Sequence, residues 1–380
     1  MSIYNEILLN KKFEQTMPIE VERKFIPLFP ETMHPYRETA RPIEQTYLSR
    51  HDEPFSLRVR EHIDESGTPQ YTATLKDKGT IDVNGLTRIE IEAQISAELY
   101  AYYKSSSALA LRKLRAEPLP GVFIDFHEDG SIIAEAENPD HWEHFAAEHG
   151  APFVEVTGDR MADNEWRAHV EYLRSGYELP RIDELNATNI AADILQEHDE
   201  AEPLVVRIAG RSGSGKSTLV RQLGSSLATY GISPIVLSTD DYHRGTRWLT
   251  SYNNGEPWTA WDDAIVYDTK AMAADLYELK NGSPIPRRVF DFSTAEPLTD
   301  GTIEPSTVII VEGIYAGSQG IAGPRELLYE MPTPLATCIG RRIIRDMQER
   351  PEFADPVKSL VYTLTHAEPA YRRQSAATGG

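Results

Sequence analysis

A glycine-rich loop between an apolar strand and a helix constrains the fold of this chain more than any other feature. Residues 204–223 are LVVRIAGRSGSGKSTLVRQL, in which Gly210 and the run Gly215, Lys216, Ser217 fit the pattern G-x-x-x-x-G-K-S. Glycines let backbone N–H groups surround phosphate oxygens, and the helix that follows adds the positive end of its dipole. The pattern therefore predicts a strand, a phosphate-binding loop and a helix in a parallel α/β sheet that binds a nucleotide.

The residues of this loop have distinct expected roles. Lys216 should reach the β- and γ-phosphates, and Ser217 should bind Mg²⁺. The residues expected to contact the nucleotide are Gly210, Gly213, Ser214, Gly215, Lys216, Ser217 and Thr218.

Two later apolar segments, PIVLSTD and TVIIVEG, also predict strands, and they lead into Asp240 and Glu312. Binding sites of open α/β sheets form at the carboxyl ends of the strands. We therefore predict that Asp240 takes a proton from an acceptor hydroxyl and that Glu312 acts on Mg²⁺. For Asp240, a role as a Mg²⁺ ligand or as a helix N-cap stays open.

Basic residues crowd the segment GRRIIRDMQER, residues 340–350. On a helix, Arg341 and Arg345 are four positions apart and share one face. This spacing predicts a lid that closes over the nucleotide phosphates. The alternative is a solvated basic helix that pairs with Asp346 and Glu349.

Residues 204–373 resemble the uridine kinase family of P-loop kinases. STDDYH is similar to the family's S-x-D-x-F-Y segment, WDDAIVYD to F-D-H-P-D-A-F-D, RVFDF to V-Y-D-F, VEGIYA to E-G-I-L-A, and RRIIRDMQER to the lid R-R-x-x-R-D-x-x-x-R. The resemblance implies that ATP or GTP donates the phosphate and that Asp240 is the catalytic base. It also implies that Glu312 is a metal ligand and that Asp262 binds a ribose hydroxyl.

Several positions depart from that family's pattern. The aromatic pair after the aspartate ends in His243, Ala295 stands at the position of a base-contacting His, and Pro297 at that of a nearby Arg. Phosphate transfer is therefore supported better than uridine recognition. The loop RWLTSYNNGEPWTAW adds four aromatic residues that either stack a base or pack in the core and lid: Trp248, Tyr252, Trp258 and Trp261.

Residues 18–160 show a different pattern of short alternating segments with one charged face each. In PIEVERKF, successive strand residues point to opposite faces, so Glu20, Glu22 and Lys24 share one face. The same alternation recurs in FSLRVR, YTATLK, TRIEIEA and IIAEAEN, and LRKLRAE is rich in bases. These segments predict an antiparallel β-rich domain whose charged faces carry Arg58, Arg60, Lys76, Arg88, Glu90, Glu92, Arg112, Lys113, Arg115, Glu135 and Glu137.

These charged faces can point either outward to water or inward to the inside of a barrel. A half-buried antiparallel strand turns polar residues to water, and any single strand here fits that view. The faces are nearly all charged, however, and their signs are grouped, which favours a closed barrel with the charges inside. An interior of unpaired charges is very costly, so it requires counter-charges such as a polyphosphate with divalent metal ions.

The segment EVERK and six later segments resemble, in order, those of the CYTH family, the triphosphate tunnel metalloenzymes. The later segments are SLRVR, YTATLKDKG, TRIEIEAQI, LRKLR, FIDFHEDGSIIAEAE and VEVTGDRMADN. The resemblance implies an eight-stranded antiparallel tunnel that binds triphosphates with Mg²⁺ or Mn²⁺. It implies metal-side acids at Glu20, Glu22, Glu135 and Glu137, and a phosphate site of Lys24, Arg58, Arg60, Lys76 and Arg115. It also implies that the catalytic groups include Lys24 together with Glu90 and Glu92, which position the metal or the attacking water.

The two patterns meet near QEHDEAEP, residues 196–203, which is acidic and ends in proline. We predict a tunnel domain over residues 1–178, a linker over 179–203 and a P-loop kinase domain over 204–380. The predicted fold class is α+β followed by α/β, an antiparallel β tunnel and then a parallel sheet.

Charge and cysteine content restrict the partners and the compartment. A net charge of −21 over 380 residues argues against general nucleic-acid binding, which needs basic surface. The single cysteine, Cys338, lies in LATCIG, which we predict to be a buried strand, and it fits a reducing compartment. Since no apolar run reaches membrane-spanning length and no signal-peptide pattern opens the sequence, we expect a cytoplasmic protein that binds no membrane. A homo-oligomer is compatible with all of these features.

Together these features predict a bifunctional enzyme whose partners are nucleotides and polyphosphates. The tunnel would hydrolyse inorganic triphosphate or a nucleoside triphosphate, and the second domain would phosphorylate a nucleoside-like hydroxyl acceptor. Two alternatives stay open. In one, the tunnel senses a nucleotide or polyphosphate without turnover and regulates the kinase. In the other, the P-loop domain is a nucleotide-binding regulator of a triphosphatase or an adenylate cyclase.

Overall fold

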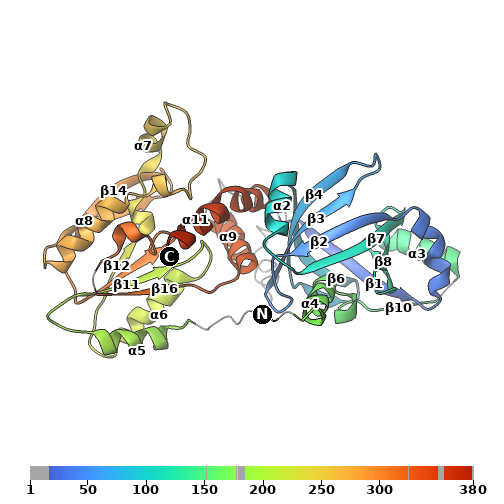
Figure 1. The fold of residues 1–380 in the computed structure, drawn as a ribbon, viewed down its shortest axis with the longest axis horizontal. Coiled ribbons are helices and arrows are strands. Elements are labelled where there is room, and N and C mark those ends of the chain that lie inside the picture. Colours follow the sequence, from blue (N-terminus) through green and yellow to red (C-terminus); the bar gives the residue numbers. More distant parts are fainter. Residues whose placement is uncertain are drawn as a thin grey trace. The chain divides into compact units, whose positions relative to one another are not determined.

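The computed structural model describes residues 17–150, 152–176, 178, 185–323, 325–349 and 355–378. Their contacts group the chain into two compact units (Figure 1). The first unit comprises Met1–Pro180 and Leu335–Val361, and the second comprises Arg181–Pro334 and Tyr362–Gly380. The chain therefore leaves the second unit after Pro334 and returns to it at Tyr362.

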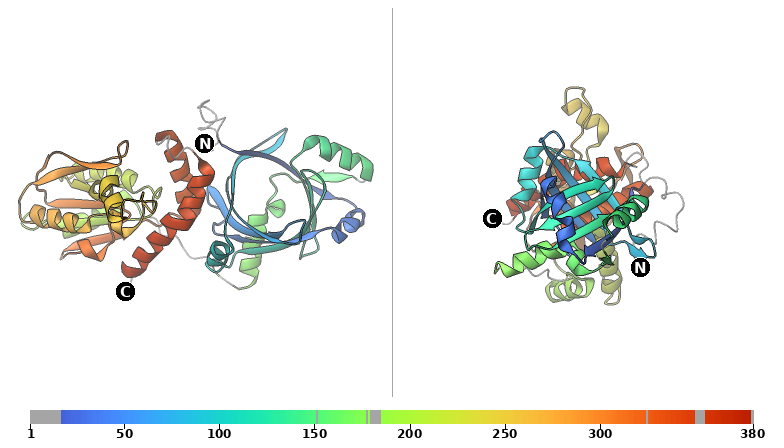
Figure 2. Two further views of the ribbon diagram at one scale, coloured as in Figure 1. Left: turned by 90° about the horizontal axis from the view of Figure 1, so that it is seen from above. Right: turned by 90° about the vertical axis from the view of Figure 1, so that its right-hand side faces the viewer.

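Eight antiparallel strands among the described residues of the first unit close into a barrel, as the sequence predicts. Their order around the ring is β1-β9-β8-β7-β2-β3-β4-β6, and β6 pairs back onto β1. Figure 2 (left) looks along this ring. Short strands β5 (Thr80–Asp82) and β10 (Phe153–Glu155) extend β6 and β1. The strands of the ring are β1 (Ile19–Pro27), β2 (Arg41–Tyr47), β3 (Phe55–Ile63), β4 (Pro69–Asp77), β6 (Gly85–Gln94), β7 (Ala110–Leu119), β8 (Val122–His127) and β9 (Ile132–Ala136).

The charged face of β1 points into the barrel. Glu22 and Lys24 are buried, whereas Ile19 and Val21 are 43% and 39% exposed on the outer surface. This is the arrangement that the closed-barrel interpretation predicts, and it reverses the usual direction of a half-buried strand.

Helices cover much of the apolar outer face of the barrel. Short helix η1 (Pro30–Glu38) and helix α3 (Pro139–His149) pack over strands β1, β8 and β9, where Phe25 stacks on Trp142 with ring centroids 4.1 Å apart. Helix α2 (Ala97–Lys104) contacts β3 and β4, and α4 (Asn164–Arg174) contacts β7 and the short helix η2 (Arg160–Ala162). A hydrophobic core therefore lies outside the ring, and it includes Phe25, Met33, Val122, Ile124, Phe126, Ile132, Ala134, Ala136, Trp142 and Phe145.

Helix α9 (Leu335–Glu349) belongs to the first unit and contacts β3 and β4. A Cβ added to Gly340 would lie 2.5 Å from the ring of Phe55, so helix and strand are in direct contact. The segment LATCIG is therefore the start of a helix, and the predicted strand there is wrong, although Cys338 is buried and free. Buried Ile339 and Ile343 are four positions apart, and this helical period outweighs the short apolar run. Helix α10 (Pro356–Tyr362) follows, so a segment of the predicted kinase domain makes its contacts with the barrel.

The second unit is built on a parallel sheet of order β12-β15-β11-β16, which confirms the predicted fold class. Helices α5 (Ala187–Glu197) and α6 (Lys216–Ala228) cover one face, and α8 (Thr269–Lys280) covers the other. The strands are β11 (Leu204–Ala209), β12 (Ile235–Ser238), β15 (Val308–Gly313) and β16 (Glu326–Glu330). A separate hairpin pairs β13 (Ile285–Asp291) with β14 (Glu296–Ile303). The remaining elements are η3 (Thr239–Tyr242), α7 (Gly245–Tyr252), η4 (Ala264–Val266), η5 (Gln319–Ile321), the π-helical turn η7 (Thr363–Ala367) and α11 (Glu368–Thr378).

Helix α5 lies within residues 179–203, which the sequence predicts to be a linker. Ile190 and Ile194 are fully buried in the core that α5 forms with β11 and α6. Buried residues at positions 187, 190, 191 and 194 have helical spacing, and the Asn186 side chain accepts from the N–H of Asn189 to cap the first turn. The second unit therefore begins before residue 204. In the part of the chain that the structure describes, no helix is long and apolar enough to cross a lipid bilayer.

Leu57 and Val21 both lie on the outer face of the barrel but differ in what covers them. Leu57 is fully buried, whereas Val21 is 39% exposed. Leu57→Ala should lower the free energy of unfolding by about 2–5 kcal/mol because it removes buried surface and leaves a cavity. Val21→Thr should change it by less than about 0.5 kcal/mol. Urea denaturation followed by circular dichroism measures both, and equal effects of the two substitutions would contradict this arrangement.

Candidate functional site

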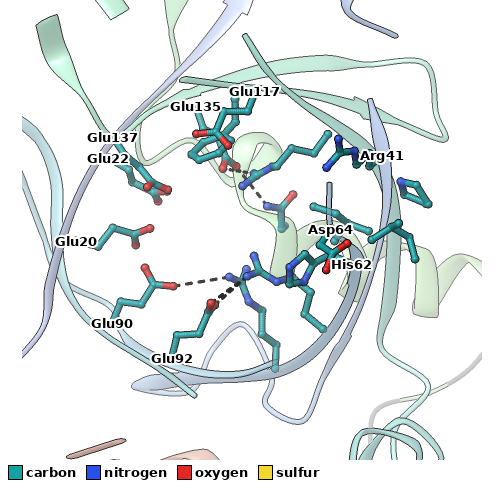
Figure 3. A pocket seen from close by; sticks show the side chains of 18 of the residues that line it. Glu20, Glu22, Arg41, His62, Asp64, Glu90, Glu92, Glu117, Glu135 and Glu137 are labelled. Carbon is teal, nitrogen blue, oxygen red and sulfur yellow. Dashed lines mark hydrogen bonds and ion pairs between the residues drawn. The ribbon is translucent and has the colours of Figure 1, made fainter. Parts of the chain in front are cut away.

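The barrel encloses a cavity of about 680 Å³, lined by the side chains in Figure 3. Most of its glutamates come from or directly follow the neighbouring strands β9, β1 and β6, and most of its bases come from β7, β2, β3 and β4 across the ring. These glutamates are Glu20, Glu22, Glu90, Glu92, Glu135 and Glu137, and the bases are Lys24, Arg41, Arg58, Arg60, Lys76, Arg88 and Arg115. Glu65 and Glu117 also line the cavity. The structure therefore brings every site residue that the tunnel resemblance implies into one cavity, whereas Arg112 and Lys113 line a different pocket.

Bases from β4 and β6 hold the two glutamates of β1. Lys76 Nζ and Arg88 Nε each lie 2.8 Å from Glu20 Oε2, and Arg88 Nη2 lies 2.7 Å from Glu22 Oε1. Burial opposes ionisation of Glu20, but Lys76 and Arg88 hold its pKa well below the usual range. Both cations therefore contact a Glu20 carboxylate that stays charged.

Lys24 lies between two acids. Its Nζ is 3.6 Å from Glu22 Oε1 and 3.4 Å from Glu135 Oε1, and it donates to Ala162 O at 3.2 Å. Burial disfavours its charge, but Glu135 and Glu22 outweigh burial and raise the pKa of Lys24 above the usual range. Lys24 is therefore a fixed cation inside the barrel.

Arg115 of β7 bridges the lumen acid Glu135 and the buried acid Asp125. Its Nε and Nη2 lie 2.6 Å from Asp125 Oδ1 and Oδ2, and Nη2 also bonds to Glu135. Lys113 lies 2.5 Å from the same Asp125, and both of these side chains are fully buried. Asp125 therefore orients the guanidinium of Arg115 toward the cavity without lining it.

The arginines of β3 pair with the glutamates of β6. Arg58 Nη2 lies 3.8 Å from Glu90 Oε1, and Arg60 Nη2 lies 3.0 Å from Glu92 Oε2. Burial raises the pKa of Glu90, although Lys76 lies 3.1 Å away. Glu90 is therefore a better proton acceptor near neutral pH than an unperturbed glutamate.

Glu137 has no ion pair within the described residues. Burial, with repulsion from Glu20 and Glu135, raises the pKa of Glu137 to about 7. A carboxylate at the cavity beside other carboxylates fits a divalent cation, whose preferred ligands are such oxygens. No three His, Cys, Asp or Glu side chains of the described chain are already arranged to hold a metal ion. The donor chemistry of Glu20, Glu22, Glu135 and Glu137 therefore fits Mg²⁺ or Mn²⁺, and their ligation stays a prediction.

Sequence reasoning does not assign Arg88, Arg41 or Asn164 to the site, yet all three line the cavity. The sequence does indicate the position of Arg88, because this residue shares the alternating face of TRIEIEA with Glu90. Arg41 lies directly across from Arg115 in the β2–β7 pair, an unfavourable like-charge neighbour unless an anion lies between them. That juxtaposition depends on strand register, which the sequence does not reveal.

In the second unit, the glycine-rich loop connects β11 to α6. Lys216 is the first residue of α6, and its Nζ donates to Gly210 O at 2.8 Å and Arg211 O at 2.9 Å. Gly213 and Gly215 have φ values of 79° and 94°, which other residues rarely adopt. The loop therefore has the conformation that a helix N-terminus needs to bind an anion.

Glu312 meets two hydroxyls at the carboxyl ends of the sheet strands. The parallel register pairs it with Ser238, and its Oε1 accepts from Ser238 Oγ at 3.2 Å and from Ser217 Oγ at 3.5 Å. Burial raises the pKa of Glu312, and the nearby Asp240 carboxylate contributes to the shift. A carboxylate and hydroxyls with excess negative charge have the donor chemistry for Mg²⁺.

Asp240 lies in η3, directly after β12. The helix N-cap is Ser238, whose Oγ accepts from the N–H of Asp240 at 3.3 Å, so Asp240 is not the cap. A Cβ added to Gly313 would lie 1.8 Å from Thr239 Oγ1, so only glycine lets β15 approach η3 this closely. Close packing therefore places Asp240 beside the metal-side acid Glu312.

Asp262 is buried and held by two tyrosines. Tyr362 OH donates to Asp262 Oδ2 at 2.8 Å and accepts from its N–H at 3.2 Å, and Tyr315 OH donates to its carbonyl at 2.8 Å. Sequence reasoning does not find Tyr362, because it lies 100 positions away along the chain.

The four aromatic residues of the loop after η3 divide into two pairs. Trp258 and Trp261 pack against the buried cluster of Leu249, Val266, Tyr267 and Tyr315. Trp248 and Tyr252 stack on each other with centroids 5.2 Å apart and stay 39% and 55% exposed. Core packing is therefore correct for one pair, whereas the other pair stays partly exposed, with the Arg244 guanidinium 4.5 Å from the ring centroid of Trp248.

The two predicted lid arginines lie on α9. Arg345 Nη2 lies 2.8 Å from Asp346 Oδ1 on the same helix, and Arg341 is exposed. Because α9 is grouped with the first unit, their contact with nucleotide phosphates stays a prediction.

Comparisons with known proteins identify the second unit. Residues 205–373 match the model of the Phosphoribulokinase / Uridine kinase family. A uridine kinase of Streptococcus agalactiae serotype V is 31% identical over 159 residues, which are 41% of this chain and 74% of that protein. A uridine kinase of Staphylococcus aureus is 30% identical over 156 residues, 40% of this chain and 73% of that protein.

Among solved structures, that of an inorganic triphosphatase matches 39% of this chain and 93% of its own, with 22% identity and a TM-score of 0.24.

The raised pKa of Glu137 predicts a pH-dependent stability. Its folded-state pKa of about 7 exceeds the ordinary value of 4.5, so the ionised carboxylate destabilises the barrel at pH 8, and the effect disappears as the pH falls from 7 to 4.5. Glu137→Gln should therefore stabilise the protein by about 1–2 kcal/mol at pH 8, after a discount for partial exposure, and leave it unchanged at pH 4. Calorimetry at both pH values measures this.

The matched control is Glu65→Gln, an exposed acid at the same cavity, which should change the melting temperature at neither pH. A shift of the Glu137→Gln melting temperature that is equal at pH 4 and pH 8 would disprove the assignment.

Proposed function

Because this chain belongs, through its second unit, to the phosphoribulokinase / uridine kinase family, we propose that this unit transfers the γ-phosphate of ATP or GTP to a hydroxyl of a nucleoside-like acceptor. We further propose that the barrel hydrolyses inorganic triphosphate or a nucleoside triphosphate. The kinase half is carried by the convergence of Ser217, Asp240 and Glu312 beside the phosphate loop. The barrel half is carried by the closed cavity with acids and bases on opposite sides.

In the proposed transfer, the loop N–H groups and Lys216 bind the phosphates and orient the γ-phosphoryl group. Asp240 accepts the proton of the acceptor hydroxyl as the hydroxyl oxygen bonds to the γ-phosphorus. At the same time the bond between the γ-phosphorus and the bridging oxygen breaks, and this oxygen leaves with the β-phosphate. The carboxylate of Asp262, which Tyr362 keeps in place, accepts a hydrogen bond from a second hydroxyl of the acceptor.

Ser217 and Glu312 would hold Mg²⁺ or Mn²⁺ in this unit. When bound, the ion supplies neutralisation of the charge on the β- and γ-phosphate oxygens.

In the proposed hydrolysis, the lumen bases exchange part of their carboxylate contacts for phosphate oxygens. Glu90 accepts a proton from the attacking water, for which its raised pKa is suited, as the water oxygen bonds to the terminal phosphorus. The bond from that phosphorus to the bridging oxygen breaks, and the diphosphate or nucleoside diphosphate leaves with this oxygen. Glu92, which is paired with Arg60, orients the water. The groups that bind phosphate are Lys24, Arg58, Arg60, Lys76 and Arg115.

Glu20, Glu22, Glu135 and Glu137 would hold the divalent ion of the barrel, which when bound neutralises charge on the terminal phosphoryl group. The expected partners of the whole chain are thus nucleotides and polyphosphates, and not nucleic acid.

Separate lysine substitutions test the two halves. Lys24→Ala should lower the rate of phosphate release from triphosphate by about 10²–10³-fold, because it removes a fixed cation from the charge-stabilising site, and leave phosphate transfer unchanged. Lys216→Ala should do the reverse. Assays of phosphate release and of transfer to a nucleoside, on both full-length variants, measure this.

Lys24→Arg, which keeps the charge, is the matched control and should retain more activity than Lys24→Ala. If both alanine variants keep both activities, the assignment of the sites fails. Binding of triphosphate by the wild type without phosphate release would favour the sensor alternative for the barrel.

Asp240→Asn tests the catalytic base. It should lower kcat for phosphate transfer by about 10²–10⁴-fold, because Asn cannot accept the hydroxyl proton, with little change in ATP affinity. Asp241→Asn is the control, since the neighbouring Asp241 uses its side-chain oxygen to accept from the N–H of Phe290 at 3.2 Å, which Asn also does. Equal losses of kcat in the two variants would show that Asp240 is not the base.

A further inference from the structure

His243 is a buried imidazole on the acceptor side that the proposed transfer does not use. It directly follows η3, three residues after Asp240, and is 8% exposed. Its ring stacks on Trp261 with centroids 5.5 Å apart and 21° between the planes, and its centroid lies 4.1 Å from that of Phe290. Tyr267 is a third aromatic neighbour, with centroids 5.7 Å apart, and the three together restrict the orientation of this ring.

A backbone contact fixes which nitrogen of His243 carries the proton. The N–H of Gly245 donates to Nδ1 at 3.1 Å, and since a backbone amide only donates, Nδ1 is the accepting nitrogen. The proton of the neutral ring is then on Nε2, which has no hydrogen-bond partner within the described chain. Burial lowers the pKa of His243 to about 4, although Asp262 opposes the shift, so the ring is neutral near pH 7.

The amide that sets this tautomer is itself held in place. Gly245 has a φ of 80°, and an added Cβ would lie 2.5 Å from Pro297 Cδ. The N–H and the hydroxyl of Thr246 both donate to Ala295 O, at 2.9 and 3.2 Å. The sequence departs from the uridine kinase pattern at His243, Ala295 and Pro297, and these three positions meet here in one arrangement.

We propose that His243 determines acceptor specificity by donating a hydrogen bond from Nε2 to a lone pair of the acceptor substrate. This inference rests on the proposed kinase reaction and deepens it. The Asp262 carboxylate acts on the same imidazole, so the site favours an acceptor without negative charge. The acceptor class is a neutral compound with hydroxyl groups for Asp262 and a carbonyl oxygen or ring nitrogen for His243, as nucleosides have.

Two substitutions separate the donor from the ring. His243→Phe keeps an aromatic ring between Trp261 and Phe290 but removes the donor. His243→Gln removes the ring but places an amide N–H near the position of Nε2. The full-length protein is assayed with ATP, Mg²⁺ and each of uridine, cytidine, adenosine and guanosine.

For the best nucleoside, His243→Phe should raise KM by about 10- to 100-fold, as expected for a lost hydrogen bond in a buried site. His243→Gln should stay within about threefold of the wild type, and KM for ATP should change in neither variant. An unchanged nucleoside KM in His243→Phe overturns the inference, and so does an equal rise in KM for ATP, which would indicate a structural role.

Failure of the proposed function looks different. A wild-type protein that phosphorylates none of the four nucleosides refutes the acceptor class and, with it, this role of His243. A wild type that phosphorylates a nucleoside while His243→Phe does so equally well refutes the role of His243 alone.

The tautomer can be tested without turnover, which also covers a His243→Phe variant that fails to fold. In protein labelled with ¹⁵N-histidine, His243 should show an unprotonated Nδ1 and a protonated Nε2, and the Nε2 signal should shift when the nucleoside is added. A protonated Nδ1, or an Nε2 signal that saturating nucleoside leaves in place, overturns the inference.

Discussion

The barrel depends on how it offsets the cost of taking charged groups out of water. Each buried ion loses several kcal/mol of solvation, so a lumen lined by many ions is stable only if opposite charges meet at short range. Three adjacent strands, β9, β1 and β6, carry most of the glutamates, and strands across the ring carry most of the bases. Pairs such as Lys76 and Glu20, 2.8 Å apart, join the two sides. Glu137 is left over, and its raised pKa marks the place where the lumen lacks a positive charge.

A charged interior moves the hydrophobic core to the outside of the ring. The apolar alternate residues of the strands pack under η1, α2, α3 and α9, as in the stack of Phe25 on Trp142. Stability and ligand binding are therefore assigned to opposite faces of the same strands. A substitution in the lumen changes charge balance with little effect on packing, and a substitution under a helix does the reverse.

The parts of this structure that follow from short-range pattern are predictable from the sequence. Period-two alternation places Glu20, Glu22 and Lys24 in the lumen, and the spacing of the glycine-rich loop places Lys216 at a helix start. The sequence does not predict two other contacts. The ion pairs of Arg88 with both β1 glutamates depend on the β1–β6 register, and the hydrogen bond of Tyr362 to Asp262 joins residues 100 positions apart. Helix α5 and the segment LATCIG both have helical spacing of their apolar residues. The acidic composition near α5 instead favoured a linker, and the short apolar run in LATCIG favoured a strand. The tautomer of His243 requires backbone geometry, which no residue pattern reports.

The two proposed phosphate sites differ in how they would select a ligand. The loop before α6 would bind phosphate with backbone N–H groups and one lysine. It therefore introduces little positive charge and needs few acids to balance that charge, of which Glu312 and Asp240 are the nearest. The barrel uses side-chain cations, and each of them requires an acid to be stable without ligand. A phosphate ligand of the barrel must therefore compete with carboxylates such as Glu20 and Glu135 for the same bases. A singly phosphorylated compound offers too few contacts to displace several such ion pairs. A triphosphate with divalent cations differs, because its phosphate oxygens take the place of the carboxylates at the bases while the cations bind the displaced carboxylates. Under the proposed function, the ion pairs of the lumen thus set a minimum ligand charge, and the two proposed phosphate sites do not compete for the same small anions.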